Sequence, residues 1–531
     1  MKEKELRNLC IGFSVMVMVL ALTLCLVGPA QSAPVPADTV VVGMSSFHEE
    51  TFLPWNGGAA RKYYLDPIYE YLVYLDPETR QATPGLATKW EMSKDGMSWT
   101  FWIRQGVQFH EGYGELTSED VKYSLERLID PKSVVGPSST MRRLVKKVEA
   151  PEKYKVVVNL NVPDIEFDLG YMSNGLCLQI VSKKYLEAKG DETANAHPIG
   201  TGAFTLVEHK KGVSIKLKAI EGVGKHWRVK PDFQNITFLV VPEESTRIAM
   251  LKTGEVDLAP INYDSIDSLK ASGLNVFSVK YNWVPIIRLG GLIKTDPKRY
   301  NPNAPWADKR VRQALNYAVD KEAIVKNIFR GEAKPAASDI PAREFFDVAA
   351  YPYDPQKAKQ LLAAAGYPNG FEITLKTFTT TPGAQLPMIG EAVGMYWQAV
   401  GLKVKIEPTE YPSLRQAWTG GQGKANDYVW THRGLAFTNT ASGMQTVVVA
   451  KSVFATYVTE ETEAKMLEID KELDVKKRSV LLKKFCEHLR DEGAHVFLVF
   501  ANEPYGASKK LAKWPTLSEY ATNIDLISRA K

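Results

Sequence analysis

Residues 79–130 decide the fold, and they read TRQATPGLATKWEMSKDGMSWTFWIRQGVQFHEGYGELTSEDVKYSLERLID. Trp99, Phe101 and Ile103 occupy alternate positions, which is the period of a half-buried strand. Thr117 then provides a helix N-cap, and Asp120 three positions later completes a capping box. The stretch therefore predicts a strand, a turn and a capped helix, and it contains no pattern typical of catalysis.

The order of residues in this stretch resembles a known protein family. It contains the patterns P-G-L-A-x-x-W, S-x-D-G-x-x-W-T-F, R-x-G-V-x-F-H-x-G and T-x-x-D-V. Together they are similar to the bacterial extracellular solute-binding proteins of the peptide, nickel and opine class (family 5), which includes oligopeptide- and dipeptide-binding proteins. Residues 198–204, PIGTGAF, and residues 306–321, WADKRVRQALNYAVDK, resemble the same family. The resemblance covers the chain from about Thr39 onward.

The resemblance implies an α/β, two-lobed periplasmic-binding-protein-like fold (cluster C) with an extra domain in the first lobe. The alternation of strand-like and helix-like segments in the chain independently favours an α/β architecture. We expect a monomer with the following boundaries: residues 1–32 for a signal peptide; 33–75, 195–280 and 491–531 for a split domain I; 76–194 for domain II; and 281–490 for domain III.

Several helices are predicted outside these motifs. Apolar residues between Tyr63 and Tyr74 recur at helical spacing, which predicts a buried aromatic helix face. Asp320 and Asp354 are placed to cap two further helices. Residues 466–489 predict one long helix near the end of the chain.

Composition narrows the class of partner. The chain has 531 residues, of which 45% are hydrophobic and 24% charged, with a formal net charge of +5. These values are ordinary for a globular protein, and the basic residues form no block that would follow a phosphate backbone, so we expect no nucleic-acid partner. Outside the N-terminal segment only Cys177 and Cys486 remain, and the sequence leaves open whether they pair.

The N-terminus is typical of an export signal. Lys2, Lys4 and Arg7 precede an apolar run from Ile11 to Val27 and then a segment of small residues. Cleavage after Ser32 would release a periplasmic or extracellular protein. The alternative is an uncleaved anchor that tethers the protein to the membrane, because the run is near the minimum length that spans a bilayer.

The segment KANDYVWTHRGLAFTNTA, residues 424–441, carries the prediction for the ligand. In peptide-binding members of the resembled family, the corresponding segment runs through a Trp to an Asp that pairs with the α-amino group of the ligand. Here Trp430 matches the Trp, and Arg433 stands where the Asp is expected, with His432 beside it. A guanidinium repels an ammonium and holds a carboxylate through two parallel hydrogen bonds. The alternative is that Arg433 is exposed or braces a carboxylate of the protein.

Three tryptophans are candidates for stacking against a ligand. Trp55, Trp283 and Trp430 offer large rigid surfaces, although each fits a core position equally well. Trp283 lies near the expected crossing between the lobes. His432 would add a hydrogen-bond donor or a pH-dependent charge.

The function that follows is the capture of a small organic solute, favoured as anionic, between two lobes and its delivery to an ABC transporter permease. An oligopeptide or dipeptide, a sugar and a metal complex remain alternative ligands, and a sensory receptor remains an alternative partner. A secreted hydrolase is the competing class, but the chain has no Gly-x-Ser-x-Gly, Cys-x-x-Cys or His-x-x-His motif. We therefore expect no catalytic residues, no metal site and no cofactor.

Overall fold

The computed structural model describes residues 36–58, 61–77, 79, 81–135, 138–175, 178–220, 226–340, 347–379, 383–419, 426–435, 440–452, 454–516 and 522–530. The predicted signal peptide, residues 1–32, and Cys177 lie outside these ranges. Within them, no helix is both long enough and apolar enough to cross a bilayer.

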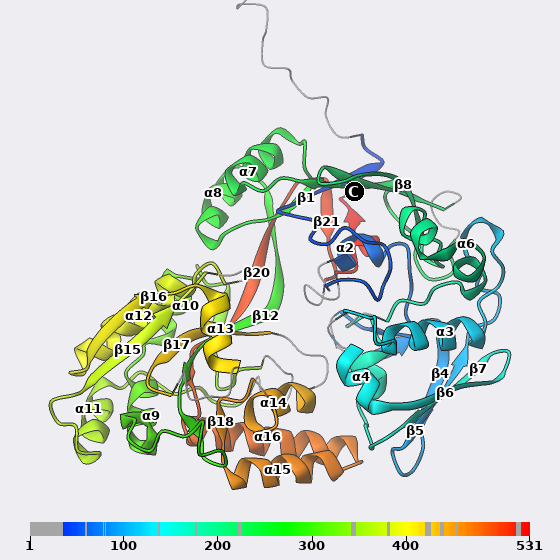
Figure 1. The fold of residues 1–531 in the computed structure, drawn as a ribbon. Helices are drawn as coiled ribbons and strands as arrows, with labels where there is room; N and C mark the ends of the chain where they lie inside the picture. Colours follow the sequence, from blue (N-terminus) through cyan, green and yellow to red (C-terminus); the bar gives the residue numbers. More distant parts are fainter. Residues whose placement is uncertain are drawn as a thin grey trace, which may run out of the picture.

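A 12-stranded sheet runs through the whole molecule in the order β16-β15-β17-β12-β20-β11-β1-β10-β9-β8, with β14 paired to β20 and β19 paired to β12 (Figure 1). Its strands are β1 (Thr39–Met44), β8 (Phe204–Lys210), β9 (Ser214–Ala219), β10 (Asn235–Val240), β11 (Leu258–Pro260), β12 (Asn275–Leu289), β14 (Ala333–Pro335), β15 (Glu372–Thr377), β16 (Lys403–Pro408), β17 (Val429–Leu435), β19 (Val496–Phe497) and β20 (Val499–Ala507). The strands from β11 to β8 belong to the first lobe, and those from β16 to β17 belong to the second.

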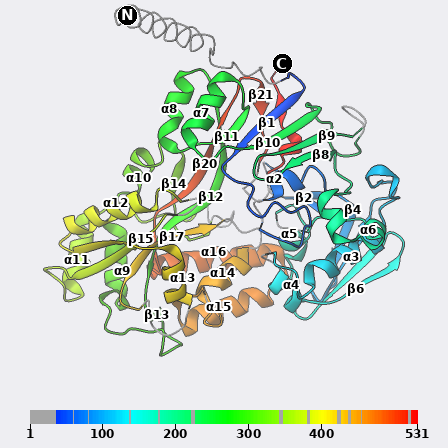
Figure 2. The ribbon, with the colours of Figure 1, turned by 45° about the horizontal axis from the view of Figure 1, so that its top comes forward.

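The long strands β12 and β20 connect the two lobes (Figures 1 and 2). They pair in an antiparallel register from Asn275 opposite Ala507 to Val279 opposite Glu503. The register then shifts before Trp283 pairs with Ala501. The sequence therefore places Trp283 correctly at the crossing between the lobes.

Residues 79–130 contribute two strands and a helix to a second, four-stranded sheet in the first lobe, whose order is β4-β5-β7-β6. Its elements are β4 (Ala87–Met92), β5 (Ser98–Ile103), β6 (Val145–Glu152), β7 (Lys155–Leu160) and the adjacent helix α3 (Ser118–Ile129). Trp99, Phe101 and Ile103 are all buried, as their alternation predicts. Asp120 Oδ2 accepts a hydrogen bond of 2.9 Å from the Thr117 amide, which confirms the predicted helix start.

Helices cover the sheets in both lobes. The first lobe carries α2 (Lys62–Leu65), α4 (Ser138–Leu144), α5 (Phe167–Tyr171), α6 (Lys183–Ala196), α7 (Glu244–Thr253) and α8 (Ile266–Ala271). The second carries α9 (Lys309–Tyr317), α10 (Lys321–Asn327), α11 (Pro355–Ala364), α12 (Leu386–Ala399), α13 (Tyr411–Thr419), α14 (Thr440–Val448), α15 (Glu460–Lys471) and α16 (Val475–Asp491). Asp320 and Asp354 accept from the amides of Ala323 and Lys357, which confirms both predicted caps.

Two predicted helices are wrong in extent. The aromatic segment from Tyr63 to Tyr74 is helical only over Lys62–Leu65, because Pro67 has no amide to continue the hydrogen-bond ladder, and the chain then enters β2 (Val73–Leu75). Residues 466–489 belong to two helices, α15 and α16. Asp474 separates them, because its side chain accepts from the Lys476 and Lys477 amides and so caps α16.

Candidate functional site

A cavity of about 390 Å³ lies between the lobes, next to β12 and β20. The first lobe contributes the end of β1 and the loop after it, one residue of α2 and the segments at 242–247 and 260–263. The second lobe contributes Gly383, Ala384 and Gln385, at the start of α12. A volume of this size is within the range of small-molecule sites in proteins.

Aromatic side chains form much of the first-lobe wall. Tyr63 and Tyr505 face each other with their hydroxyl oxygens 2.5 Å apart. Trp283 Nε1 donates to the Tyr263 hydroxyl at 3.3 Å, and that hydroxyl in turn donates to the carbonyl of Asn502. These four rings are buried and joined to β12 or β20, so the wall is a rigid, largely apolar surface.

The charged side chains at this wall are engaged by the protein itself. Arg247 donates to the carbonyls of Val241 at 2.8 Å and Pro242 at 2.7 Å. Glu244 accepts from the Asn262 amide at 2.6 Å, and Glu503 accepts from Asn282 Nδ2 at 2.6 Å. These groups hold the loops around the cavity in position.

The second-lobe wall is the N-terminal end of α12. This helix connects the parallel strands β15 and β16, so it runs antiparallel to them and begins at their carboxyl ends. A Cβ built on Gly390 would lie 2.4 Å from Thr377 Cγ2 and 3.3 Å from Thr431 Cγ2, which shows how closely α12 packs on β15 and β17. Among the described residues no side chain caps α12, so the positive end of its dipole points toward the cavity, although the Leu386 amide donates to the Gly383 carbonyl and Pro387 has no amide.

Arg433 lies near the carboxyl end of β17, which runs parallel to β15. It is two residues beyond Thr431 and therefore faces the same side of the sheet, the side that α12 covers. Its side chain is half-buried, and its buried Nη1 has no hydrogen-bond partner among the described residues. Arg433 does not line the cavity itself, but it stands on the side of the sheet where the α12 N-terminus borders that cavity.

Trp430 and His432 face the opposite side of β17, toward the interior of the second lobe. Trp430 is 1% exposed, with its ring 5.9 Å from that of Tyr428. His432 lies beside Arg288, and burial together with the Arg288 and Arg433 charges holds the pKa of His432 well below its ordinary value. His432 is therefore a neutral interior residue in this structure.

Trp55 lies in the first lobe, away from the cavity lining. The Arg127 guanidinium is 4.3 Å from its ring centroid, and its carbonyl accepts from the Val134 amide. Of the five predicted ligand-contacting residues, Trp283 lines the cavity, and Arg433 is on the α12 side of β17. Tyr63, Tyr263, Tyr505 and the start of α12 line it as well. The spacing around Tyr63 predicts only a packing role, and Tyr263 and Tyr505 belong to no pattern in the sequence that indicates a ligand.

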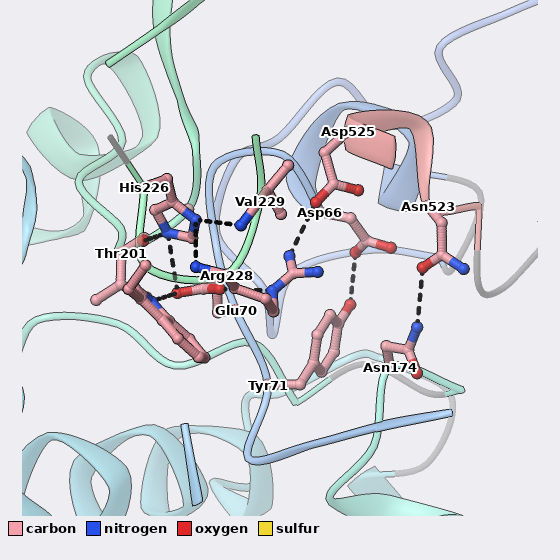
Figure 3. A network of polar contacts seen from close by, with 12 residues as sticks. Asp66, Glu70, Tyr71, Asn174, Thr201, His226, Arg228, Val229, Asn523 and Asp525 are labelled. Atoms are coloured by element: carbon pink, nitrogen blue, oxygen red, sulfur yellow. Dashed lines mark hydrogen bonds and ion pairs between the residues drawn. The ribbon is translucent and has the colours of Figure 1, made fainter. Parts of the chain in front are cut away.

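A buried polar network fixes α2, the helix that presents Tyr63 to the cavity (Figure 3). Asp66 accepts from the Tyr71 hydroxyl at 2.5 Å and from Lys62 Nζ at 3.2 Å. Four residues later, fully buried Glu70 accepts from Arg228 Nε at 2.9 Å. Arg228 also donates to Asp525 at 2.8 Å, so the network ties α2 to segments far away in the sequence.

Two observations bear on catalysis and metals. Thr456 Oγ1 is 2.9 Å from His495 Nε2, and His495 Nδ1 is 3.6 Å from Asp339 Oδ2. These three side chains form a hydroxyl–imidazole–carboxylate series, but each is at most 3% exposed and none lines the cavity. Arg288 also donates to the Thr456 hydroxyl, so a substrate has no access to this group. Among the described residues, no group of three or more His, Cys, Asp or Glu side chains could hold a metal ion.

Comparisons with known proteins give the family. Residues 81–451 match the family described as bacterial extracellular solute-binding proteins, family 5. Heme-binding protein A of Haemophilus influenzae is 30% identical over 399 residues, 68% of this chain and 69% of its own. The dipeptide-binding protein of Escherichia coli is 30% identical over 463 residues, 78% and 82% of the two chains. The structure of HbpA2 from Haemophilus parasuis superposes with a TM-score of 0.77 at 24% identity, over 93% of this chain and 100% of the other.

Proposed function

This chain belongs to the bacterial extracellular solute-binding proteins of family 5, and we propose that its solute is an organic carboxylate anchored by Arg433. As a member of that family it captures a small solute between two lobes and delivers it to an ABC transporter permease. The family acts outside the cytoplasm. That residues 1–32 are a cleaved signal, and that the lobes divide at the boundaries predicted from the sequence, are parts of the proposal.

The observation that carries the proposal is the buried Nη1 of Arg433 near the carboxyl end of β17, which has no hydrogen-bond partner in the described part of the chain. In α/β sheets, ligands bind beyond the carboxyl ends of the strands, and helix N-termini favour anions there. The start of α12 borders the cavity on this same side through Gly383, Ala384 and Gln385. A guanidinium and a helix N-terminus on one side of a cleft favour a carboxylate and disfavour an ammonium group.

The first-lobe wall supports an apolar or aromatic body for the solute. The rings of Tyr63, Tyr263, Trp283 and Tyr505 line this wall, and the charged groups nearby are engaged by the protein. A carboxylate with a flat or extended apolar part would therefore lie on the rings and direct its charge toward Arg433. Trp283 is the ligand-stacking residue of this proposal, whereas Trp55, Trp430 and His432 act through packing.

The proposal is tested by calorimetry and thermal shift with matched pairs of ligands: aromatic and aliphatic acids, each beside its primary amide. Ligand at one hundred times its dissociation constant adds about 2.7 kcal/mol of stability. We expect acids to bind and amides to fail, and Arg433→Ala to weaken acid binding by about 10- to 150-fold, the worth of a hydrogen bond to a charged group. Arg310→Ala is the matched control, because Arg310 is 50% exposed and pairs with Asp308.

The second candidate solute is a dipeptide or oligopeptide, favoured by the 30% identity to the Escherichia coli dipeptide-binding protein. The same screen therefore includes free dipeptides and their N-acetylated forms. Tight binding of free dipeptides that Arg433→Ala leaves unchanged would refute the carboxylate anchor and establish the peptide role. Heme carries two carboxylates and is included because a heme-binding relative is equally similar.

A further inference from the structure

The two lobes also meet at the rim of the cleft, far from the strands that connect them. Arg478 Nη2 of α16 lies 3.6 Å from Glu166 Oε2 of the first lobe, and these side chains are 7% and 17% exposed. Leu473, between α15 and α16, lies so close that a Cβ at Gly96 would be 3.1 Å from its Cδ2. Figures 1 and 2 both show α15 and α16 reaching toward the part of the first lobe that holds α4.

This contact is distinct from the β12–β20 connection. Arg478 lies near the N-terminus of α16, and the chain returns to β19 and β20 only after the other end of that helix, at Asp491. The 13 steps of the helix from Arg478 to Asp491 span about 20 Å. Opening of the lobes about the connecting strands would separate two groups at this distance widely, so an interaction between them opposes opening.

We propose that Glu166 and Arg478 form a clasp that holds the lobes together independently of the solute. Each partner is positioned by its own lobe. Arg478 Nη1 donates to the Ile469 carbonyl at 2.7 Å. The Glu166 amide donates to Asp164 Oδ1 at 2.9 Å, and Trp99 Nε1 donates to the Asp164 carbonyl at 2.8 Å. Because both sides are ordered before they meet, little conformational entropy is lost when the clasp forms.

The surrounding charges make Arg478 the centre of the clasp. Two further carboxylates interact electrostatically with Arg478, those of Asp164 in the first lobe and Asp470 in the second, and Asp168 adds negative charge beside Asp164. Burial raises the pKa of Asp164 to about 6, and the Arg478 guanidinium opposes that rise from the other lobe. Asp168 and Asp470 are engaged by Trp90 Nε1 at 2.8 Å and Gln445 Nε2 at 2.7 Å. Arg478 thus offsets acidic charge on both sides of the contact.

The clasp rests on the lobe closure of the proposed function but not on the identity of the solute. The clasp sets the fraction of solute-free protein that is closed. A bound solute then shifts this equilibrium further toward the closed state through its own contacts. Failure of the carboxylate screen would therefore leave the clasp intact, and failure of the clasp would leave the carboxylate anchor intact.

The test measures lobe separation without added solute, by double electron–electron resonance between spin labels on Val134→Cys and Leu467→Cys. These side chains are 66% and 54% exposed, one in each lobe, and neither belongs to the clasp. Cys177→Ser removes one background thiol, and Cys486 is buried and is kept. The variants are Glu166→Arg, Arg478→Glu and the double swap, with Lys484→Glu on the exposed side of α16 as the control for net charge.

We expect the wild type and the control to populate a closed distance, each single reversal to lower the closed-to-open ratio about tenfold, and the swap to restore most of it. Melting temperatures identify any variant that fails to fold, and Glu166→Gln, which keeps the shape of the side chain, then replaces Glu166→Arg. The proposal is overturned if the wild type is fully open, or if folded single variants keep the wild-type distance distribution.

Discussion

Replacing Glu70 by glutamine tests whether the buried network in Figure 3 holds the first lobe together. Glu70 is fully buried and accepts from Trp227 Nε1 and Arg228 Nε, each at 2.9 Å. Burial disfavours its charged form, yet a hydrogen bond from His226 and the charge and hydrogen bond of Arg228 hold its pKa below the ordinary value. Glu70 is therefore ionised at neutral pH and carries half of a buried ion pair.

The expected cost follows from what the carboxamide cannot do. The amides of Arg228 and Val229 both donate to His226 Nδ1, so Nε2 of that ring carries its proton and points toward the Thr201 carbonyl, 2.8 Å away. Trp227 Nε1 and Arg228 Nε each donate to one carboxylate oxygen of Glu70. Glutamine would keep one acceptor oxygen and replace the other with an N–H₂ group, so one of these two donors would lose its partner. Removing one member of a buried ion pair costs about 3–5 kcal/mol.

The assay is equilibrium urea unfolding followed by tryptophan fluorescence and by circular dichroism. We expect Glu70→Gln to lower the free energy of unfolding by about 3 kcal/mol and Glu70→Ala to lower it further, because alanine leaves both donors unpaired. Glu91→Gln is the matched control, since Glu91 is 56% exposed and its ion pair with Lys89 is worth less than about 1 kcal/mol. A loss below about 0.5 kcal/mol in Glu70→Gln would refute this account of the network.

Three further predictions concern single residues. Lys321 is buried, and burial lowers its pKa to about 7, so the unfolded chain binds more protons between pH 7 and 10.5. Lys321→Met removes a cost of up to about 5 kcal/mol for burying this charge, but it leaves the Asn316 and Tyr351 carbonyls without the Nζ donor. Urea unfolding should therefore show the variant to be more stable, relative to the wild type, at pH 6 than at pH 10. Burial raises the pKa of Asp164 to about 6, so the folded form binds more protons than the unfolded chain between pH 4 and 6. Asp164→Asn should therefore raise the free energy of unfolding by up to about 3 kcal/mol at pH 7 and leave it unchanged at pH 3.5. Equal effects at both pH values would contradict this. A Cβ at Gly434 would lie 2.0 Å from the Asp339 carbonyl oxygen, so Gly434→Ala should lower the free energy of unfolding by about 1–3 kcal/mol. An unchanged urea midpoint would show that the 338–340 segment moves aside freely.

The fold could be predicted because its signals are local and periodic. The alternation around Trp99 and the caps at Asp320 and Asp354 each depend on a few neighbouring residues, and all three are confirmed. The helix expected from Tyr63 to Tyr74 is wrong because helical spacing of aromatics cannot reveal which of them are buried by distant segments. Those residues pack against the rest of the first lobe from a largely non-helical backbone.

The candidate site could be predicted only in part, because it depends on the register of one strand. Neighbouring residues of β17 face opposite sides of the sheet, so His432 points into the second lobe and Arg433 toward the α12 side. The sequence identifies both as polar residues of the right segment but cannot tell which side of the sheet each faces. It also gives no sign that α12 begins beside the cavity, since that follows from the order of strands in the sheet.

The division of the cavity between the lobes determines which solute contacts can favour the closed state over the open one. Tyr63, on α2, and Tyr505, on β20, belong to one wall with their hydroxyl oxygens 2.5 Å apart, so we expect them to stay together in the open and the closed cleft. A solute that touches this wall alone binds both states equally and shifts no population. The start of α12 and Arg433 move with the second lobe, so only contacts to them distinguish the closed state. Arg433→Ala should therefore weaken solute-induced closure as well as affinity, whereas a smaller residue at Tyr63 should weaken affinity without changing the closed fraction of the bound protein.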